Sequence, residues 1–177
     1  MLKRIIDRFR GEASTETLVK YGLTVGENFQ RQAQCIIDPS HCWLIKIGDN
    51  VTLAPRVHIL AHDASTKMHL GYTKIGKVII GNNVFIGAGS VILPNVQVGN
   101  NVIIGAGSVI SKDIPDNTVV GGNPATIICP TSEYIQKHGS RMSARPTYDE
   151  NWTFDNITND MKKQMKQELE NGIGYIV

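Results

Sequence analysis

Aliphatic residues recur at every sixth position through the middle of the chain. They stand at Ile80, Ile86, Ile92, Val98, Ile104 and Ile110, after an earlier run at Ile47, Leu53 and Ile59. Residues 80–97 and 98–115 are identical at 11 of their 18 aligned positions. A helix repeats its apolar face every 3.6 residues and a strand every two, so neither explains a period of six. The pattern predicts a coil of three short strands per turn, stacked so that the aliphatic residues form one column.

Glycine and asparagine follow the aliphatic positions at fixed offsets, at Gly81, Asn82, Gly99 and Asn100. Both residue types tolerate a positive φ, so we expect these four positions to form tight corners between strands. A sandwich of short strands would not require residue-for-residue recurrence at eighteen. The sequence therefore predicts a β-helix over residues 25–128.

The repeat is interrupted once, and the chain differs at both ends. Residues 63–79 leave the register and predict an outward loop, which is a common place for functional residues. Residues 1–24 predict a helical cap, because Leu2, Ile5, Ile6 and Phe9 have helical spacing. Residues 129–177 predict an extension with one helix, marked by Met161, Met165 and Leu169.

Composition narrows the classes of function. The formal net charge of the 177 residues is +2, which indicates no general affinity for nucleic acid. The three cysteines, Cys35, Cys42 and Cys129, have no CxxC spacing and are odd in number, which favours reduced thiols. No signal-peptide core or membrane-spanning segment is evident. We therefore expect a cytoplasmic protein without membrane insertion.

The run IGNNVFIGAGSVILPNVQVGNNVIIGAGSVISKDIPDNTVVGGNPA resembles the hexapeptide-repeat acyltransferases. Within that family it is most similar to the maltose, galactoside, xenobiotic and capsular-polysaccharide O-acetyltransferases. The segment DPSHCWLIKIGDNVTLAPRVHILAHDASTK is similar to the polysaccharide-cluster members. Over roughly residues 25–128, the resemblance implies a left-handed parallel β-helix, an exception to the usual right-handed crossover. It also implies acetyl-CoA as co-substrate and a homotrimer with active sites between subunits.

The resemblance also implies roles for individual residues. His62 precedes the outward loop and follows Ala54-Pro55-Arg56-Val57, which is the place of the family's catalytic histidine. An imidazole can remove a proton from a sugar hydroxyl near neutral pH. Asp63 is a candidate to orient His62, or simply to cap the loop. The backbone N–H of Ala88 matches the family's oxyanion donor.

Two further sets of residues are candidates for binding. The residues that match the coenzyme A binding site of the family are Phe85, Ala106, Ser111 and Lys112. Three residues before the first coil with a regular hexapeptide pattern could face a carbohydrate or nucleotide-sugar acceptor, namely Asp38, His41 and Trp43. Each set has a structural alternative: Lys112 could be a solvated lysine on a turn, and the acceptor set could pack an irregular coil.

The function that these features favour is acetyl transfer from acetyl-CoA to a sugar hydroxyl in polysaccharide biosynthesis, without a metal. Two alternatives remain open. A metal-dependent hydratase of the carbonic-anhydrase kind would need three histidines around zinc, and His58, His62 and His69 lack the expected spacing. A non-catalytic assembly subunit would not need a histidine beside the loop. The sequence does not separate a hydroxyl acceptor from an amine.

Overall fold

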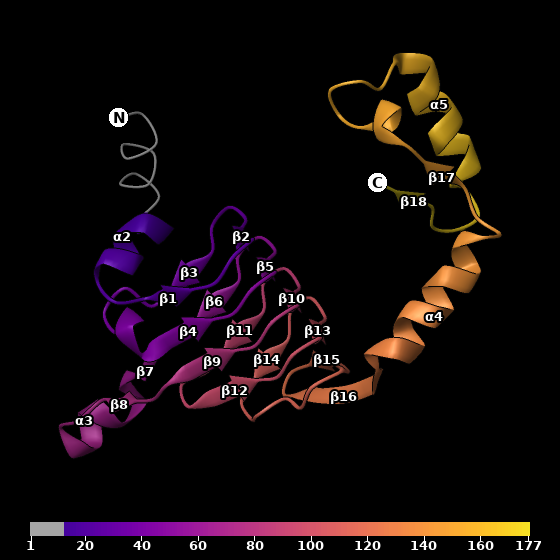
Figure 1. Cartoon of the computed structure of the whole chain (residues 1–177). Helices are drawn as coiled ribbons and strands as arrows, with labels where there is room; N and C mark the ends of the chain where they lie inside the picture. Colours follow the sequence, from indigo (N-terminus) through magenta and orange to yellow (C-terminus); the bar gives the residue numbers. More distant parts are fainter. Residues whose placement is uncertain (1–12) are drawn as a thin grey trace. The chain divides into compact units, whose positions relative to one another are not determined.

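The computed structural model describes residues 13–177, which fall into two compact units divided between Thr131 and Ser132 (Figure 1). The helix expected over Leu2–Phe9 lies outside the described residues. A short helix, α2 (Thr15–Lys20), precedes the first strand and is capped by Ser14, whose side chain accepts a hydrogen bond from the Thr17 N–H. Its Leu18 is buried with the first strands in the core of the first unit.

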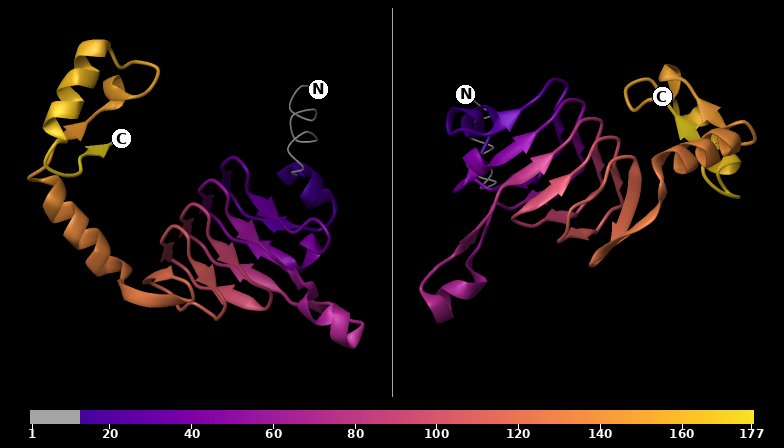
Figure 2. Two further views of the ribbon diagram at one scale, coloured as in Figure 1. Left: turned by 180° about the vertical axis from the view of Figure 1, so that it is seen from behind. Right: turned by 60° about the horizontal axis from the view of Figure 1, so that its bottom comes forward.

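The first unit is built from three sheets of short strands, which the chain visits in turn (Figures 1 and 2). The strands within each sheet are parallel, except that β16 pairs antiparallel with β15 at the end of sheet B. Sheet A contains β1 (Thr24–Val25), β4 (Ile45–Ile47), β9 (Val78–Ile80) and β12 (Val96–Val98). Sheet B contains β2 (Gln30–Arg31), β5 (Thr52–Leu53), β10 (Phe85–Ile86), β13 (Ile103–Ile104), β15 (Thr118–Gly122) and β16 (Ala125–Pro130). Sheet C contains β3 (Ile36–Ile37), β6 (His58–Ile59), β11 (Val91–Ile92) and β14 (Val109–Ile110).

The hexapeptide period sets the strand register. Val91 pairs with Val109 and Ile92 with Ile110, an offset of 18 residues, so identical positions of successive coils lie next to each other. The aliphatic residue of each hexad is buried, and the six from Ile80 to Ile110 are at most 1% exposed. Removing this apolar area from water supplies the main stabilisation of the coil. Cys35 and Cys42 are buried in the same core.

The corners between sheets A and B differ in one detail from the expectation. The residues with positive φ are Asn83 and Asn101, together with Asn28, Asn50 and Asn117 in the same column. Gly81, Asn82, Gly99 and Asn100 do not have positive φ, so that prediction was wrong. Gly81 is needed for another reason: a Cβ there would lie 2.7 Å from the Gly99 carbonyl oxygen. The asparagine side chains form a ladder in which Asn83 Nδ2 donates to Asn101 Oδ1 at 3.0 Å.

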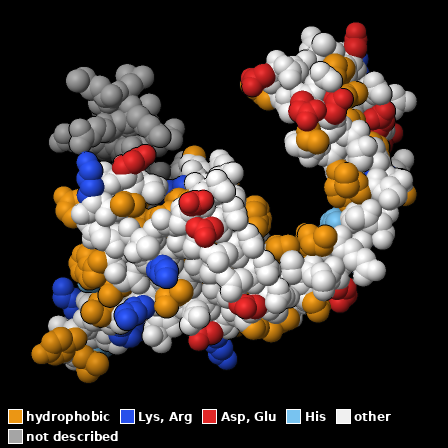
Figure 3. All heavy atoms as spheres, in the orientation of Figure 1, with side chains coloured by type: hydrophobic (Ala, Val, Ile, Leu, Met, Phe, Trp, Pro, Cys, Tyr) orange, Lys and Arg blue, Asp and Glu red, His pale blue; other side chains and the backbone are white. Residues whose placement is uncertain are grey.

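The interruption of the repeat is an excursion from the corner between sheets C and A. It comprises β7 (His62–Asp63), η2 (Ala64–Thr66), α3 (Lys67–Leu70) and β8 (Lys74–Ile75). β7 and β8 pair in antiparallel fashion, so the chain leaves and returns at one corner. Figure 2 shows the excursion projecting away from the coils. Hydrophobic side chains gather at its tip (Figure 3), where Met68 is 90% exposed.

The second unit is small and mixed. It contains most of α4 (Thr131–Met142), then β17 (Thr147–Tyr148), η3 (Glu150–Trp152), α5 (Asn159–Glu168) and β18 (Tyr175–Ile176). The expected methionine stripe lies on the half-buried face of α5 and continues to Leu169 at its C-cap. The sequence patterns gave no sign of α4 or of the β17–β18 pair. Across residues 13–177, no helix combines the length and apolar character needed to span a membrane.

Candidate active site

The candidate site lies at the corner between sheets C and A, where the excursion begins. Asp38 follows β3 in the first coil, and His62 follows β6 in the second. Because β3 and β6 pair in parallel, with Ile37 opposite Ile59, the residues that follow them are brought together. The Asp38 N–H donates to the Ile59 carbonyl at 2.9 Å, which continues the ladder to the corner. The repeat register thus juxtaposes a carboxylate and an imidazole that are 24 residues apart.

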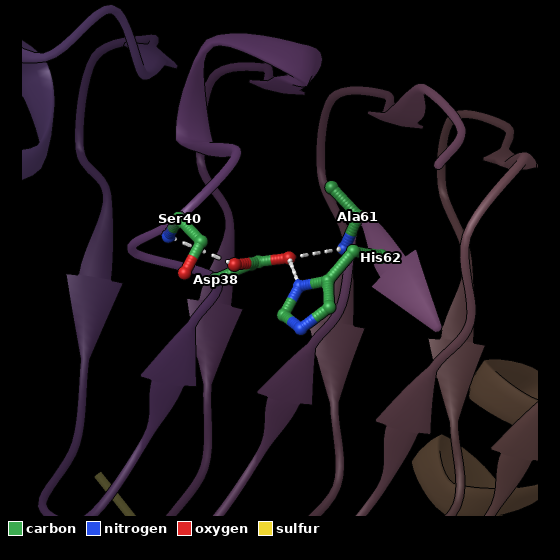
Figure 4. Close-up of polar contacts among 4 residues, drawn as sticks. All are labelled: Asp38, Ser40, Ala61 and His62. Atoms are coloured by element: carbon green, nitrogen blue, oxygen red, sulfur yellow. Dashed lines mark hydrogen bonds and ion pairs between the residues drawn. The ribbon is translucent and has the colours of Figure 1, made fainter. Parts of the chain in front are cut away.

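Asp38 is the carboxylate that contacts His62. Its Oδ2 lies 2.5 Å from His62 Nδ1, and its side chain is fully buried, whereas that of His62 is 36% exposed. The Ala61 N–H donates to the same oxygen at 3.0 Å, and the Ser40 N–H donates to Oδ1 at 2.9 Å. Figure 4 shows the carboxylate held between these donors and the imidazole. Asp38 therefore has little freedom to move, and it fixes the plane of the ring.

Two opposing effects act on the pKa of Asp38. Burial raises it, but hydrogen bonds from His62, Ala61 and Ser40 together outweigh burial and hold the pKa below its usual value. The group is therefore ionised at neutral pH. An ionised carboxylate can only accept, so His62 Nδ1 carries a proton and donates it. The other ring nitrogen, Nε2, then keeps its lone pair and can act as a base when the ring is neutral.

Asp63, the other candidate to orient His62, has different partners. Its Oδ2 lies 2.6 Å from Lys74 Nζ across the β7–β8 pair, and its Oδ1 accepts from the Ser65 N–H at 2.8 Å. The hydrogen bond from Lys74, followed by that from Ser65, lowers the pKa of Asp63 to about 2. Asp63 caps η2 and joins the two strands of the excursion. Of its two roles considered from the sequence, the structure favours capping the loop.

His41 and Trp43 lie beside the pair. The His41 ring centroid is 5.2 Å from that of His62 and 5.3 Å from that of Trp43. His41 Nδ1 is buried and has no hydrogen-bond partner within the described part of the chain. Trp43 is 57% exposed, so its ring is available to a ligand. The side chain of Asp38 is inaccessible to a sugar acceptor, and its oxygens accept hydrogen bonds from His62, Ala61 and Ser40.

A cleft of about 390 Å³ opens on the same corner, between the excursion and the following coils. Asp63, Lys74 and Ile75 line it from the excursion, and Leu93, Pro94 and Asn95 line it from the third coil. Ser111, a predicted coenzyme A contact, lines it from the fourth coil. Lys112 is the next residue and is exposed. Both walls of the cleft combine polar and apolar side chains.

The remaining predicted residues lie elsewhere on the coil. Ala88 and Ala106 occupy the corner between sheets B and C, where the Gly107 N–H donates to the Ala88 carbonyl at 2.8 Å. Phe85 begins β10 of sheet B and is 46% exposed. Ala88 precedes β11 and Pro94 follows it, so the two residues lie at opposite corners of sheet C. Within one chain, therefore, Ala88 does not reach His62.

The three-sided coil, with a histidine and an outward loop at one corner, is the arrangement that the resemblance to hexapeptide-repeat acyltransferases implies, and the comparisons agree. The family model for bacterial transferase hexapeptide, six repeats, matches residues 77–112. Protein CapG of Staphylococcus aureus is 39% identical over 142 residues, which cover 77% of this chain and 83% of that protein. The chain belongs to the hexapeptide-repeat transferase family.

Solved structures give the same result. A maltose O-acetyltransferase from Clostridium difficile 630 is 47% identical, with a TM-score of 0.55 over 62% of this chain. A galactoside acetyltransferase in complex with coenzyme A is 34% identical, with a TM-score of 0.58 over 65% of this chain. The chain spans 59% and 58% of these two proteins. The predicted family, the acetyltransferase class and acetyl-CoA as the co-substrate of that class are confirmed.

Proposed function

We propose that this protein transfers the acetyl group of acetyl-CoA to a hydroxyl of a sugar. The observation that carries the proposal is the buried Asp38 carboxylate on Nδ1 of a half-exposed His62. This arrangement directs the basic nitrogen, Nε2, away from the carboxylate and toward any ligand at the corner. The coil supports the proposal because its paired strands make the site rigid.

The transfer needs one base and no covalent enzyme intermediate. His62 Nε2 takes the proton of the sugar hydroxyl as its oxygen attacks the thioester carbonyl. The carbonyl oxygen becomes an oxyanion, which a backbone N–H such as that of Ala88 would stabilise. When the C–S bond breaks, the coenzyme A sulfur leaves and receives the proton from His62. Asp38 keeps its negative charge throughout and stabilises the imidazolium that forms between the two proton transfers.

We further propose a left-handed coil and a homotrimer, as in the family that the sequence resembles. The corner geometry supports a shared site: His62, Ser111 and Lys112 are on one corner, and Phe85, Ala88 and Ala106 are on sheet B or its far corner. A neighbouring subunit can bring the second set against the first, which one chain cannot. A cytoplasmic location accords with acceptors that are activated sugars.

Sedimentation tests the assembly. We expect a species of three chains at the concentrations used for assay, because the site needs two subunits. The same preparation should be assayed for acetyl transfer. Full activity in a monomeric species would contradict both the trimer and the shared site.

The acceptor class is tested by a transfer screen with acetyl-CoA. We expect simple sugars or nucleotide sugars to be acetylated on oxygen in preference to amino sugars or small amines. The exposed Trp43 supports this, because an aromatic face can stack on a sugar ring. Thiol release measures the rate, and NMR of the product identifies the acetylated atom. Preference for an amine over every hydroxyl acceptor would contradict O-acetylation and leave the donor unaffected.

The hydratase alternative finds no support in the arrangement of the histidines. His58 is on β6 of sheet C, and His69 is on α3 of the excursion. In residues 13–177, neither belongs to the group of side chains close enough to share a metal ion, which is Asp38, His41 and His62.

A further inference from the structure

The side chains of Asp38, His41 and His62 have a second property that the transfer reaction does not use. One potential ligand atom from each lies within 4.8 Å of the other two. His41 adds a feature of its own, because its Nδ1 is buried and has no partner in the described residues. A buried polar atom without a partner destabilises the fold, so its retention calls for an explanation.

We propose that this trio binds a divalent cation of the Zn²⁺ type, and that the bound cation switches acetyl transfer off. Two imidazoles and one carboxylate are a ligand set that zinc accepts, with the fourth position left open. Tetrahedral zinc places neighbouring ligand atoms about 3.3–3.5 Å apart. His62 Nδ1 and Asp38 Oδ2 are closer than that, at 2.5 Å, because a proton lies between them that a cation would displace.

The inhibitory effect follows from which nitrogen of His62 the cation takes. Asp38 contacts Nδ1, so a cation shared by Asp38 and His62 replaces the proton on that nitrogen. A neutral imidazole bound to metal through Nδ1 carries its remaining proton on Nε2. Nε2 then has no lone pair with which to accept the proton of a hydroxyl. The cation and the basic form of His62 are therefore mutually exclusive.

The site differs from a chance pair of surface histidines because its carboxylate is buried and held in place. The Asp38 carboxylate is fully buried and is fixed by backbone donors from Ser40 and Ala61. Those donors orient the carboxylate in the way that surrounding hydrogen bonds orient ligands in metal sites. The His62 side chain is 36% exposed, so the trio can be reached from solvent on its side.

Binding is tested on chelator-stripped protein without acetyl-CoA, so that the result is independent of the proposed activity. Co²⁺ serves as the spectroscopic probe and Zn²⁺ as the competitor. We expect one equivalent of Co²⁺ per chain with the absorption of a tetrahedral site, displaced by Zn²⁺. His41→Gln and His41→Asn should each weaken binding by more than about 10-fold. His69→Gln, which alters an exposed histidine of the excursion, should bind as the wild type does, and thermal unfolding verifies folding of each variant.

Inhibition is tested separately and rests on the proposed function. Zn²⁺ should abolish acetyl transfer at one equivalent, and chelation should restore it. Failure of well-folded protein to bind Co²⁺, or binding that both His41 variants leave unchanged, would overturn the site. Stoichiometric binding with undiminished transfer would overturn the switch. Absence of transfer from metal-free protein would instead count against the proposed function.

Discussion

Replacing His62 with alanine is expected to lower turnover by about 10²–10⁴-fold while the protein stays folded. The reason is that the sugar hydroxyl then has no base at the corner of the coil, whereas binding of acetyl-CoA is retained. The ring is half exposed, so its loss leaves no large cavity in the aliphatic column. Steady-state kinetics with acetyl-CoA and a sugar acceptor, together with thermal unfolding, measure both effects.

The matched control is His69→Ala, which removes an exposed imidazole from the excursion and should retain wild-type turnover. Acetyl transfer at the wild-type rate by folded His62→Ala would remove His62 from the mechanism. An equal loss in the two variants would indicate that the excursion, rather than the base, had been damaged.

The second large effect is expected from Asp38→Asn. An amide at this position carries no charge to stabilise the imidazolium, and its NH₂ group must face one of the donors that now point at a carboxylate oxygen. If the NH₂ group faces His62, the ring adopts the wrong tautomer, a change that costs up to about 10⁴-fold in hydrolases built on a similar pair. We expect turnover to fall by about 10²–10⁴-fold, with the KM for acetyl-CoA little changed.

Asp63→Asn distinguishes the role of Asp63, which is next to His62 in the sequence, from that of Asp38, which contacts His62 in the structure. Its carboxylate joins Lys74 and Ser65, so its loss should loosen the excursion and lower turnover far less than Asp38→Asn. Thermal unfolding of both variants verifies that each remains folded. A larger kinetic loss from Asp63→Asn than from Asp38→Asn would return the positioning role to Asp63.

The repeating part of the fold is predictable from the sequence because one physical requirement recurs in every coil. Each hexad must fill the column with an aliphatic residue such as Ile86 or Ile104, and these residues show the period directly. The corner geometry was harder to predict. Both glycine and asparagine tolerate positive φ, and only the structure shows that Asn83 has it while Gly81 avoids contact with the coil below.

The candidate site was predictable only in part. His62 stands at the break of the repeat, which is visible in the sequence. The partner of His62 was not predictable, because the adjacent Asp63 was the obvious candidate and the actual partner, Asp38, is 24 residues away. The register of β3 against β6 could have indicated it, since the residue after Ile37 lies next to the chain that leads to His62. Assigning that register from the sequence requires the position of β3 in the first coil, where the hexapeptide pattern is weak.

The central claim, that Asp38 holds His62 with Nε2 free to act as base, is tested most directly by ¹⁵N NMR of protein labelled at histidine. The chain has five histidines, and spectra of the His62→Ala variant identify the signals of His62. We predict that neutral His62 is protonated on Nδ1, with Nε2 unprotonated, and that Asp38→Asn alters this state while Asp63→Asn does not. Protonation on Nε2 in the metal-free wild type would contradict the account.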